Sequence, residues 1–304
     1  MSENSSVHKI YDAIIVGGSY SGLSAAMALG RALKDVLIID NVDPCNKSTP
    51  FSHNFLTNDG VKPEELQFKA KTQVSQYTTV SFVTGKAITG KITGSEFAIQ
   101  VENGEIFNGK FLIFATGIKD ILPPISGISE CWGISVLHCP FCHGYEVRNE
   151  KTGILVNGNA DTDFIRLISN WTKNLVVFTN GTDSLNENQK KELKDHNITI
   201  SEKVIKHLEH QNGILQKMHF TDDTSLEISV LYAPSPFEQK CKIPESLGCE
   251  LTDEGYIKID NMNETSLSGI YATGDNSSRM RTVANAVSMG TTTGIIISKK
   301  LILH

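Results

Sequence analysis

The first forty residues alternate between short apolar runs and small or polar residues. Residues 12–16 (DAIIV) suit a strand buried on both faces, and residues 36–39 form a second apolar run that ends on Asp40. Between them, a glycine-rich turn at 17–22 precedes a run of small and apolar residues, 23–33, that predicts a helix. This order predicts a βαβ unit with two parallel strands.

A second unit of the same kind begins near Gly153. Residues 154–156 are strand-like, residues 157–161 form a polar turn, residues 163–171 suit a helix, and residues 175–178 are again apolar. The chain therefore contains a crude internal repeat of a dinucleotide-binding half.

The remaining segments complete the predicted architecture. Residues 80–101 and 198–228 are rich in strand formers, and residues 282–301 show a helical pattern of small residues. Two loops also echo each other, because ATG at 115–117 and ATGD at 272–275 both follow apolar runs. We expect an α/β fold with two Rossmann-like dinucleotide-binding domains, the second inserted into the first.

The expected domain boundaries follow from this arrangement. Residues 1–117 and 244–304 should form the outer domain, and residues 118–243 the inserted domain that carries the second repeat. A chain of 304 residues with 39% hydrophobic positions is long enough for two such domains.

Charge and apolar stretches narrow the function classes. The net charge of −6 argues against nucleic acid or an anionic membrane as the main partner. No apolar stretch precedes the first strand, and the apolar segment 294–297 is too short to cross a bilayer. We therefore expect a soluble, cytoplasmic protein.

The first turn carries the residues that a dinucleotide site requires. Gly17 and Gly22 occupy the positions for the tight turn and for close helix–strand packing, whereas Ser19 replaces the usual second glycine. The helix that follows offers free N–H groups to a diphosphate, and Asp40 is placed to hold ribose hydroxyls. The predicted contacts from this turn are Gly17, Gly18, Ser19, Tyr20, Ser21 and Gly22.

The second turn is poorly suited to a nucleotide. It retains only Gly158 of the glycine pattern, and Asp161 and Asp163 place negative charge at the start of the helix. Thr179 stands at the end of the next strand, where an acid would hold a ribose. Residues 174–189 contain no Lys or Arg that could bind a 2′-phosphate. We expect a retained fold whose nucleotide site has decayed.

Two of the six cysteines are separated by only two residues. Cys139 and Cys142 can form a disulfide if they share the first turn of a helix, where Pro140 is well tolerated. A helix N-terminus and the flanking His138 and His143 would lower a thiol pKa and move protons near neutral pH. This pattern favours a redox-active pair.

Other interpretations of the cysteines remain open. The motif could be a zinc knuckle, but His196, His207 and His210 lack the spacing of a second ligand pair. The two thiols could also be plain buried residues. For the isolated cysteines we expect buried, inert thiols: Cys45, Cys131, Cys241 and Cys249.

With a dinucleotide turn at the start, CPFC in the middle and GIYATGDN near the end, nearly the whole chain resembles the low-molecular-weight thioredoxin reductase family. The resemblance implies that FAD binds the outer domain. It also implies that the CxxC lies in the inserted pyridine-nucleotide domain and that the enzyme is a homodimer.

The resemblance further implies specific cofactor contacts. Gly17, Ser19, Gly22 and Asp40 would hold the ADP half of FAD, and Asn54 in SHNFLTNDG would lie near the flavin. The other implied contacts are Thr116, Gly117, Gly274, the ribityl-binding Asp275, and Arg281, Thr282 and Val283 at the start of the last helix.

Catalytic roles are implied in the same way. Cys142 would face the flavin, Cys139 would exchange with substrate, and His143 would replace the family's acid, with His138 in reserve. The string CPFCHGYE more closely resembles a sub-branch that includes dithiol oxidases of fungal epidithio-toxin pathways, which return electrons to oxygen.

Three functions follow as hypotheses. The first is a dithiol oxidase, or a disulfide oxidoreductase that receives its electrons from something other than a nicotinamide. The second is an NADPH-dependent thioredoxin-disulfide reductase, and the third is a non-catalytic flavin electron carrier or redox sensor. The thiol partner could be a small dithiol or disulfide, thioredoxin or a dedicated protein, and the direction of electron flow is open.

Overall fold

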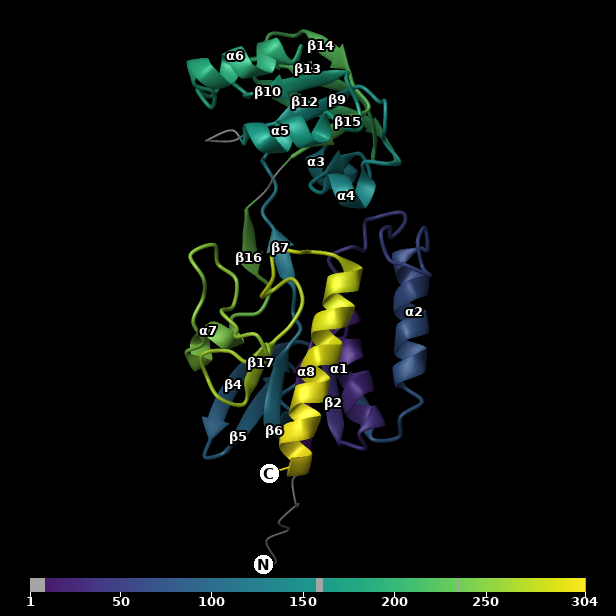
Figure 1. Cartoon of the computed structure of the whole chain (residues 1–304), viewed down its shortest axis with the longest axis vertical. Helices are drawn as coiled ribbons and strands as arrows, with labels where there is room; N and C mark the ends of the chain where they lie inside the picture. The colour runs from purple at the N-terminus through teal and green to yellow at the C-terminus, as the bar shows by residue number, and fades with distance from the viewer. Residues whose placement is uncertain (1–8, 157–160, 234–235, 304) are drawn as a thin grey trace, which may run out of the picture. The chain divides into compact units, whose positions relative to one another are not determined.

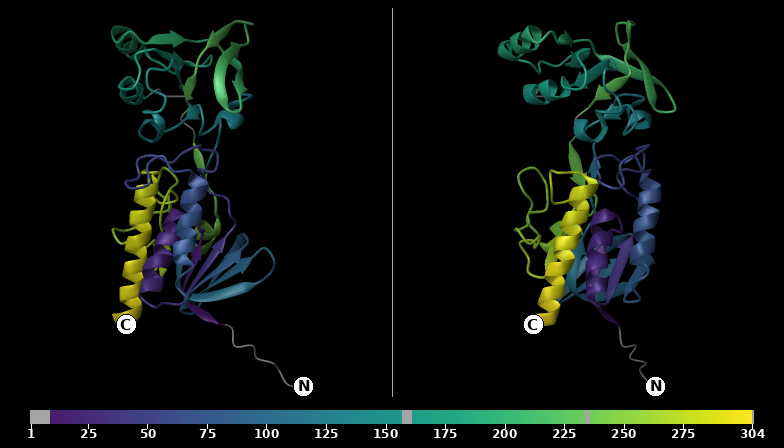
Figure 2. Two further views of the ribbon diagram at one scale, coloured as in Figure 1. Left: turned by 90° about the vertical axis from the view of Figure 1, so that its right-hand side faces the viewer. Right: turned by 45° about the vertical axis from the view of Figure 1, so that its right-hand side comes forward.

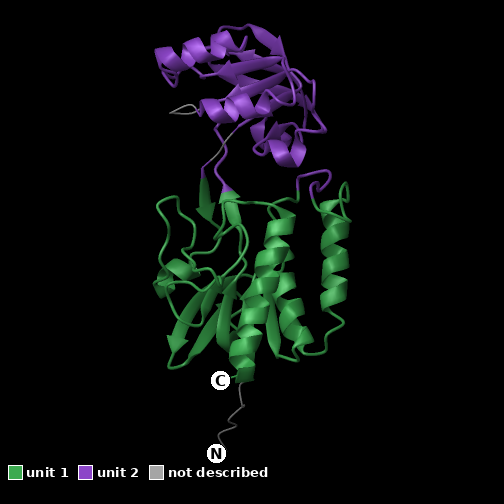
Figure 3. Ribbon diagram, in the orientation of Figure 1, with its two compact units in different colours: residues 1–47, 55–119, 237–304 green, residues 48–54, 120–236 purple. Residues whose placement is uncertain are grey.

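The computed structural model describes residues 9–156, 161–233 and 236–303, which form two compact units (Figure 3). The first unit contains residues up to 47, 55–119 and 237 onward, and the second contains 48–54 and 120–236. None of the helices in the described residues is both long and apolar enough to cross a membrane.

The division lies close to the boundaries expected after residues 117 and 243. It falls after residues 119 and 236 because β7 (Ile118–Asp120) pairs with β16 (Phe237–Gln239). Segment 48–54 belongs to the second unit, which no sequence pattern indicated.

The first unit is built on one mixed sheet. Its strands, in spatial order, are β3 (Val80–Thr84), β2 (Val36–Asp40), β1 (Ile10–Val16), β6 (Ile106–Phe114), β5 (Glu96–Val101) and β4 (Ala87–Thr93), with β17 (Ile270–Ala272) also paired to β6. The contacts of β1 with β2 and β6, of β2 with β3, and of β17 with β6 are parallel, whereas β4 and β5 are antiparallel.

Three long helices lie together on one face of this sheet (Figures 1 and 2). They are α1 (Tyr20–Arg31), α2 (Pro63–Val74) and α8 (Val283–Leu303). Ala13 and Ile15 pack toward α1 and α8, whereas Ile14 and Val16 pack into a separate core on the other face. Because both faces of this part of β1 are buried, residues 13–16 are all apolar, as predicted. The short α7 (Ile243–Leu247) contributes to the second core.

The second unit repeats the parallel arrangement on a smaller scale. Its main sheet has the order β11 (Thr199–Ser201), β10 (Leu175–Phe178), β9 (Thr152–Leu155), β15 (Val230–Tyr232) and β8 (Val136–Leu137). A separate antiparallel sheet contains β12 (Ile205–Gln211), β13 (Ile214–Phe220) and β14 (Ser225–Glu227). The helices are α3 (Ile128–Cys131), α4 (Pro140–His143), α5 (Thr162–Ile168) and α6 (Glu187–Asp195). The expected α/β fold with a Rossmann-like repeat is confirmed.

Candidate active site

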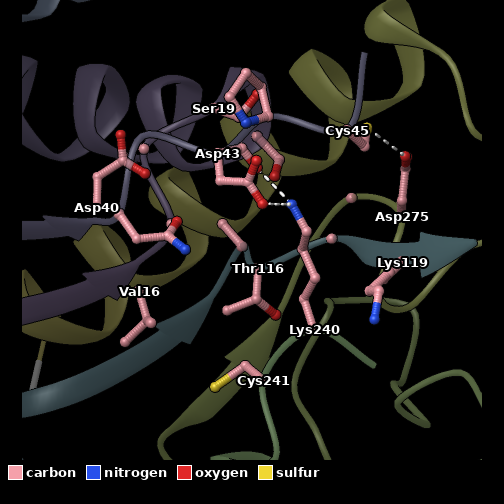
Figure 4. A pocket seen from close by; sticks show the side chains of 18 of the residues that line it. Val16, Ser19, Asp40, Asp43, Cys45, Thr116, Lys119, Lys240, Cys241 and Asp275 are labelled. Atoms are coloured by element: carbon pink, nitrogen blue, oxygen red, sulfur yellow. Dashed lines mark hydrogen bonds and ion pairs between the residues drawn. The ribbon is translucent and has the colours of Figure 1, made fainter. Parts of the chain in front are cut away.

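The first unit contains a cavity of about 770 Å³ (Figure 4). Its walls include residues at or just after the carboxyl ends of β1, β2, β6 and β17, among them Gly17, Asp40, Ala115 and Gly274. Because these strands run parallel, their carboxyl ends meet at one edge of the sheet, where α/β folds bind their ligands.

The glycine turn is shaped by close backbone approach. Gly17 has a φ of 108°, and a Cβ on Gly17 or Gly22 would collide with neighbouring main chain. A Cβ on Gly18 would lie only 2.7 Å from the carboxylate carbon of Asp40, so the turn and the acid are in direct contact.

The N-terminus of α1 is available to an anion. Ser19 is the extended N-cap residue, it makes no side-chain capping hydrogen bond, and the first turn contains no acidic residue. The first turn of the helix therefore borders the cavity without a competing carboxylate from α1.

Most of the predicted cofactor residues line this cavity. They are Gly17, Gly18, Ser19, Tyr20, Ser21, Asp40, Thr116, Gly117, Gly274, Asp275, Arg281, Thr282 and Val283. Gly22 lies against the Gly17 main chain, so it allows the start of α1 to pack closely on the turn. Asn54 is exposed, belongs to the second unit and is not part of this lining.

The sequence reasoning missed the loop after β2 and the residues after β16. Lys240 Nζ donates to the Asp43 carboxylate at 2.8 Å and to the Asp43 main-chain oxygen at 2.5 Å, inside the cavity (Figure 4). Hydrogen bonds from Lys240 and Lys47 lower the pKa of Asp43 to about 2. The only available signal was the position of these polar residues after strand ends.

The residues present fit a dinucleotide. Asp40, placed to hold a ribose, and Asp275 lie on opposite sides of the cavity, with Ser19 between them (Figure 4). The start of α8 adds a second helix N-terminus without acidic residues in its first turn. Carboxylates for hydroxyls and helix N-termini for phosphates are the donor and acceptor set that FAD requires.

The second unit holds the cysteine pair. Cys139 and Cys142 form a disulfide with a Cα–Cα separation of 5.4 Å, and Cys142 N donates to Cys139 Sγ at 3.2 Å. Pro140 occupies the first turn of α4, as predicted. However, α4 has only four residues, so its dipole contributes less to a low thiol pKa than expected.

The flanking histidines have different surroundings. Burial, together with the nearby His53, lowers the pKa of His143 to about 4, so this imidazole is neutral at neutral pH. This differs from the expectation of a group that titrates near pH 7. His138 stacks on Trp132 with ring centroids 5.7 Å apart.

The cysteines differ in bonding and in exposure. The disulfide leaves neither sulfur as a thiolate ligand, and the described residues contain no cluster of three potential metal ligands. Cys131 and Cys249 are buried, and burial raises the pKa of these thiols and of the partly buried Cys241. The expectation for Cys45 is wrong, because this thiol is exposed in the loop beside the cavity.

Aromatic residues around the disulfide were also missed. Phe141 is 62% exposed and meets Trp171 edge-on at 5.6 Å, while Tyr145 is 67% exposed and lies under Arg148. Gly144 contacts the Trp171 ring, since a Cβ there would lie 2.9 Å from it. The disulfide is thus flanked by apolar surface that a sulfur-containing substrate could contact.

The second dinucleotide half is described except for its turn. Gly158 and the rest of turn 157–160 lie outside the described residues. Asp161 caps α5 by accepting from Phe164 N at 3.1 Å. Thr179 is 2% exposed, and its main-chain oxygen accepts from Thr182 Oγ1 at 2.6 Å, so the loop after β10 closes on itself.

Comparison with known proteins agrees with this geometry. Residues 11–290 match the pyridine nucleotide-disulphide oxidoreductase family. A thioredoxin reductase of Aspergillus oryzae is 28% identical over 304 residues, covering 96% of each chain.

Solved structures give the same picture. The crystal structure of a thioredoxin reductase, TrxB, from Bacillus anthracis has a TM-score of 0.92 at 28% identity, covering 96% of this chain and 98% of its own. An oxidoreductase from Agrobacterium tumefaciens has a TM-score of 0.89 at 31% identity, covering 97% and 99%. The chain therefore belongs to the pyridine nucleotide-disulphide oxidoreductase family and is an FAD-binding disulfide oxidoreductase related to thioredoxin reductases.

Proposed function

We propose that this enzyme exchanges electrons between FAD and a substrate dithiol or disulfide through Cys139 and Cys142, without efficient use of NADPH or NADH. In the favoured direction it acts as a dithiol oxidase. The observation that supports this proposal is a disulfide centre in the same unit as a nucleotide half whose described residues place Asp161 and Asp163 at the start of α5 and bury Thr179.

The case against a nicotinamide rests on charge and burial in the second unit. Asp161 and Asp163 put two carboxylates at the start of α5, where a diphosphate would need N–H groups and positive charge. Thr179 replaces the ribose-binding acid and is buried. Each missing charge-assisted contact costs about 1.5–3 kcal/mol of affinity.

The chain's own residues account for the thiol half of the reaction. A substrate thiolate attacks the Cys139 sulfur, and the electron pair of the broken S–S bond remains on Cys142 as a thiolate. The second substrate thiol then displaces Cys139, which leaves an oxidised substrate and a Cys139–Cys142 dithiol. FAD, held in the first unit by the turn, Asp40 and Asp275, supplies a two-electron acceptor when bound.

Anaerobic mixing tests the proposal. The FAD-loaded protein is mixed with NADPH, NADH or dithiothreitol while the flavin absorbance is followed. We expect bleaching by the dithiol alone. A Cys139→Ser/Cys142→Ser double variant is the control, since it should keep FAD but lose this response. Rapid bleaching by micromolar NADPH or NADH would sink the proposal.

An NADPH-dependent thioredoxin reductase is the second candidate. The relatives named thioredoxin reductases favour it, and Arg166 offers a cation in the last turn of α5. However, Arg166 already contacts Asp163 at 3.5 Å and Glu192 at 3.6 Å. A redox sensor, the third hypothesis, would show no catalytic turnover of any dithiol.

The substrate is a small dithiol or a thioredoxin-like protein, recognised in part by the exposed Phe141 and Tyr145. We also propose a cytoplasmic homodimer, by resemblance to the family.

A further inference from the structure

Four titratable side chains of the second unit lie close together, and one of them is next to Cys142 in the chain. His143 directly follows Cys142, and His53 lies near enough for its charge to act on His143. His53 Nε2 is 3.6 Å from Glu146 Oε1, and the charge of Glu146 acts in turn on the hydroxyl of Tyr232. Glu146 ends the string CPFCHGYE, but no motif linked His53 to the cysteines.

The protonated form of His143 is disfavoured. Its pKa of about 4 means that its protonated form is a strong acid at neutral pH. Burial and the nearby charge of His53 both disfavour the protonated form of His143. A proton that reaches His143 therefore has to move on.

His53 has a carboxylate partner. The Glu146 carboxylate faces its imidazole, and a carboxylate stabilises an imidazolium. The His53 side chain is 18% exposed and that of Glu146 is 40% exposed, so the pair joins the protein interior to solvent.

The other groups around this pair do not compete for the proton. Burial and the charge of Glu146 raise the pKa of Tyr232 well above its ordinary value, so the phenol remains neutral. Arg148, the cation nearest in sequence to Glu146, donates instead to the Tyr145 main-chain oxygen at 2.6 Å.

We propose that the His53–Glu146 pair accepts the proton of the attacking substrate thiol, relayed through His143. The substrate S–H loses its proton to this relay as its sulfur bonds to Cys139. The Cys139–Cys142 bond breaks, and Cys142 keeps the electron pair as a thiolate. His53 acts through His143 and is therefore a positioning residue that holds the proton. The proton then leaves to solvent past Glu146.

This inference rests on the proposed thiol exchange, but its test needs no flavin turnover. The probe is dithiothreitol, mixed anaerobically with the full protein. The opening of the Cys139–Cys142 disulfide is followed by timed alkylation and mass spectrometry. The variants are His53→Gln and Glu146→Gln. The matched control is His219→Gln, which breaks a comparable His–carboxylate pair of 2.6 Å with Glu209 in the same unit.

We expect His53→Gln and Glu146→Gln to slow disulfide opening about tenfold near pH 6.5, while His219→Gln matches the unsubstituted protein. Above the ordinary thiol pKa of about 8.5, the thiol is already ionised and the deficit should disappear. A deficit of equal size at every pH would indicate structural damage and overturn the proposal, as would no deficit at pH 6.5. Failure of the flavin to bleach with dithiol would refute the proposed function while leaving this measurement interpretable.

Discussion

At the residue scale, Asp40 shows how one side chain joins the fold to cofactor binding. It ends β2 and lies against Gly18, and it makes one wall of the cavity. Neither its contact with the turn nor its place in the cavity depends on the second unit.

We predict that Asp40→Ala weakens FAD binding by about 10–100-fold, because hydrogen bonds from ribose hydroxyls to a carboxylate are lost. The measurement is titration of the apoprotein with FAD, followed by flavin fluorescence. Asp35→Ala is the control, since the Asp35 side chain forms an exposed ion pair with Lys9 at 3.1 Å and lies outside the cavity lining. Equal FAD affinity in the two variants would contradict the assignment.

At the element scale, the packing of α8 on α1 supports the cavity. A Cβ on Gly290 would collide with the main chain of Ser21, and a Cβ on Gly294 would lie 2.5 Å from the Ala25 main-chain oxygen. Ser21 Oγ also donates to the Thr273 main-chain oxygen at 3.1 Å. The start of α1, which should hold the diphosphate, is thus positioned by two small residues near the other end of the chain.

We predict that Gly290→Ala destabilises the first unit by about 1–3 kcal/mol, because backbone cannot yield as a side chain can. The expected fall in the midpoint of thermal FAD release is roughly 3–10 °C. Thr291→Ala on the exposed face of α8 is the control and should leave the midpoint nearly unchanged. A Gly290→Ala protein as stable as the control would show that α8 is not closely packed at this point.

At the scale of the whole molecule, His143 couples stability to pH. Its pKa is about 4 in the folded chain against an ordinary 6.5. Between these values the unfolded chain binds a proton that the folded chain does not, so stability rises with pH across this window. The contribution is at most about 3 kcal/mol.

We predict that His143→Asn flattens the pH dependence of stability between pH 4 and 6.5. Trp132 and Trp171, the two tryptophans of the chain, both lie in the second unit. Their fluorescence during urea unfolding therefore reports on the unit that contains His143. His196→Asn, on the exposed end of α6, is the control. An unchanged slope in His143→Asn would mean that burial does not disfavour its charged form.

Much of the fold and part of the site could be predicted from the sequence. Local apolar periodicity indicated β1, α1, β2 and the long last helix, and the glycine turn, Asp40 and the ATGD loop placed one wall of the cavity. These predictions succeeded because each depends on residues close together in the chain. The CxxC spacing likewise sufficed to suggest the disulfide.

Only the tertiary structure decided which distant residues meet. It brings Lys240 to Asp43 and His53 to Glu146, and it exposes Cys45 beside the cavity. It also buries His143, so that a histidine expected to titrate near neutral pH has a pKa of about 4. The physical reason is that periodicity and turn chemistry are local properties, whereas burial and the field at a charge arise from chain segments that only folding brings together.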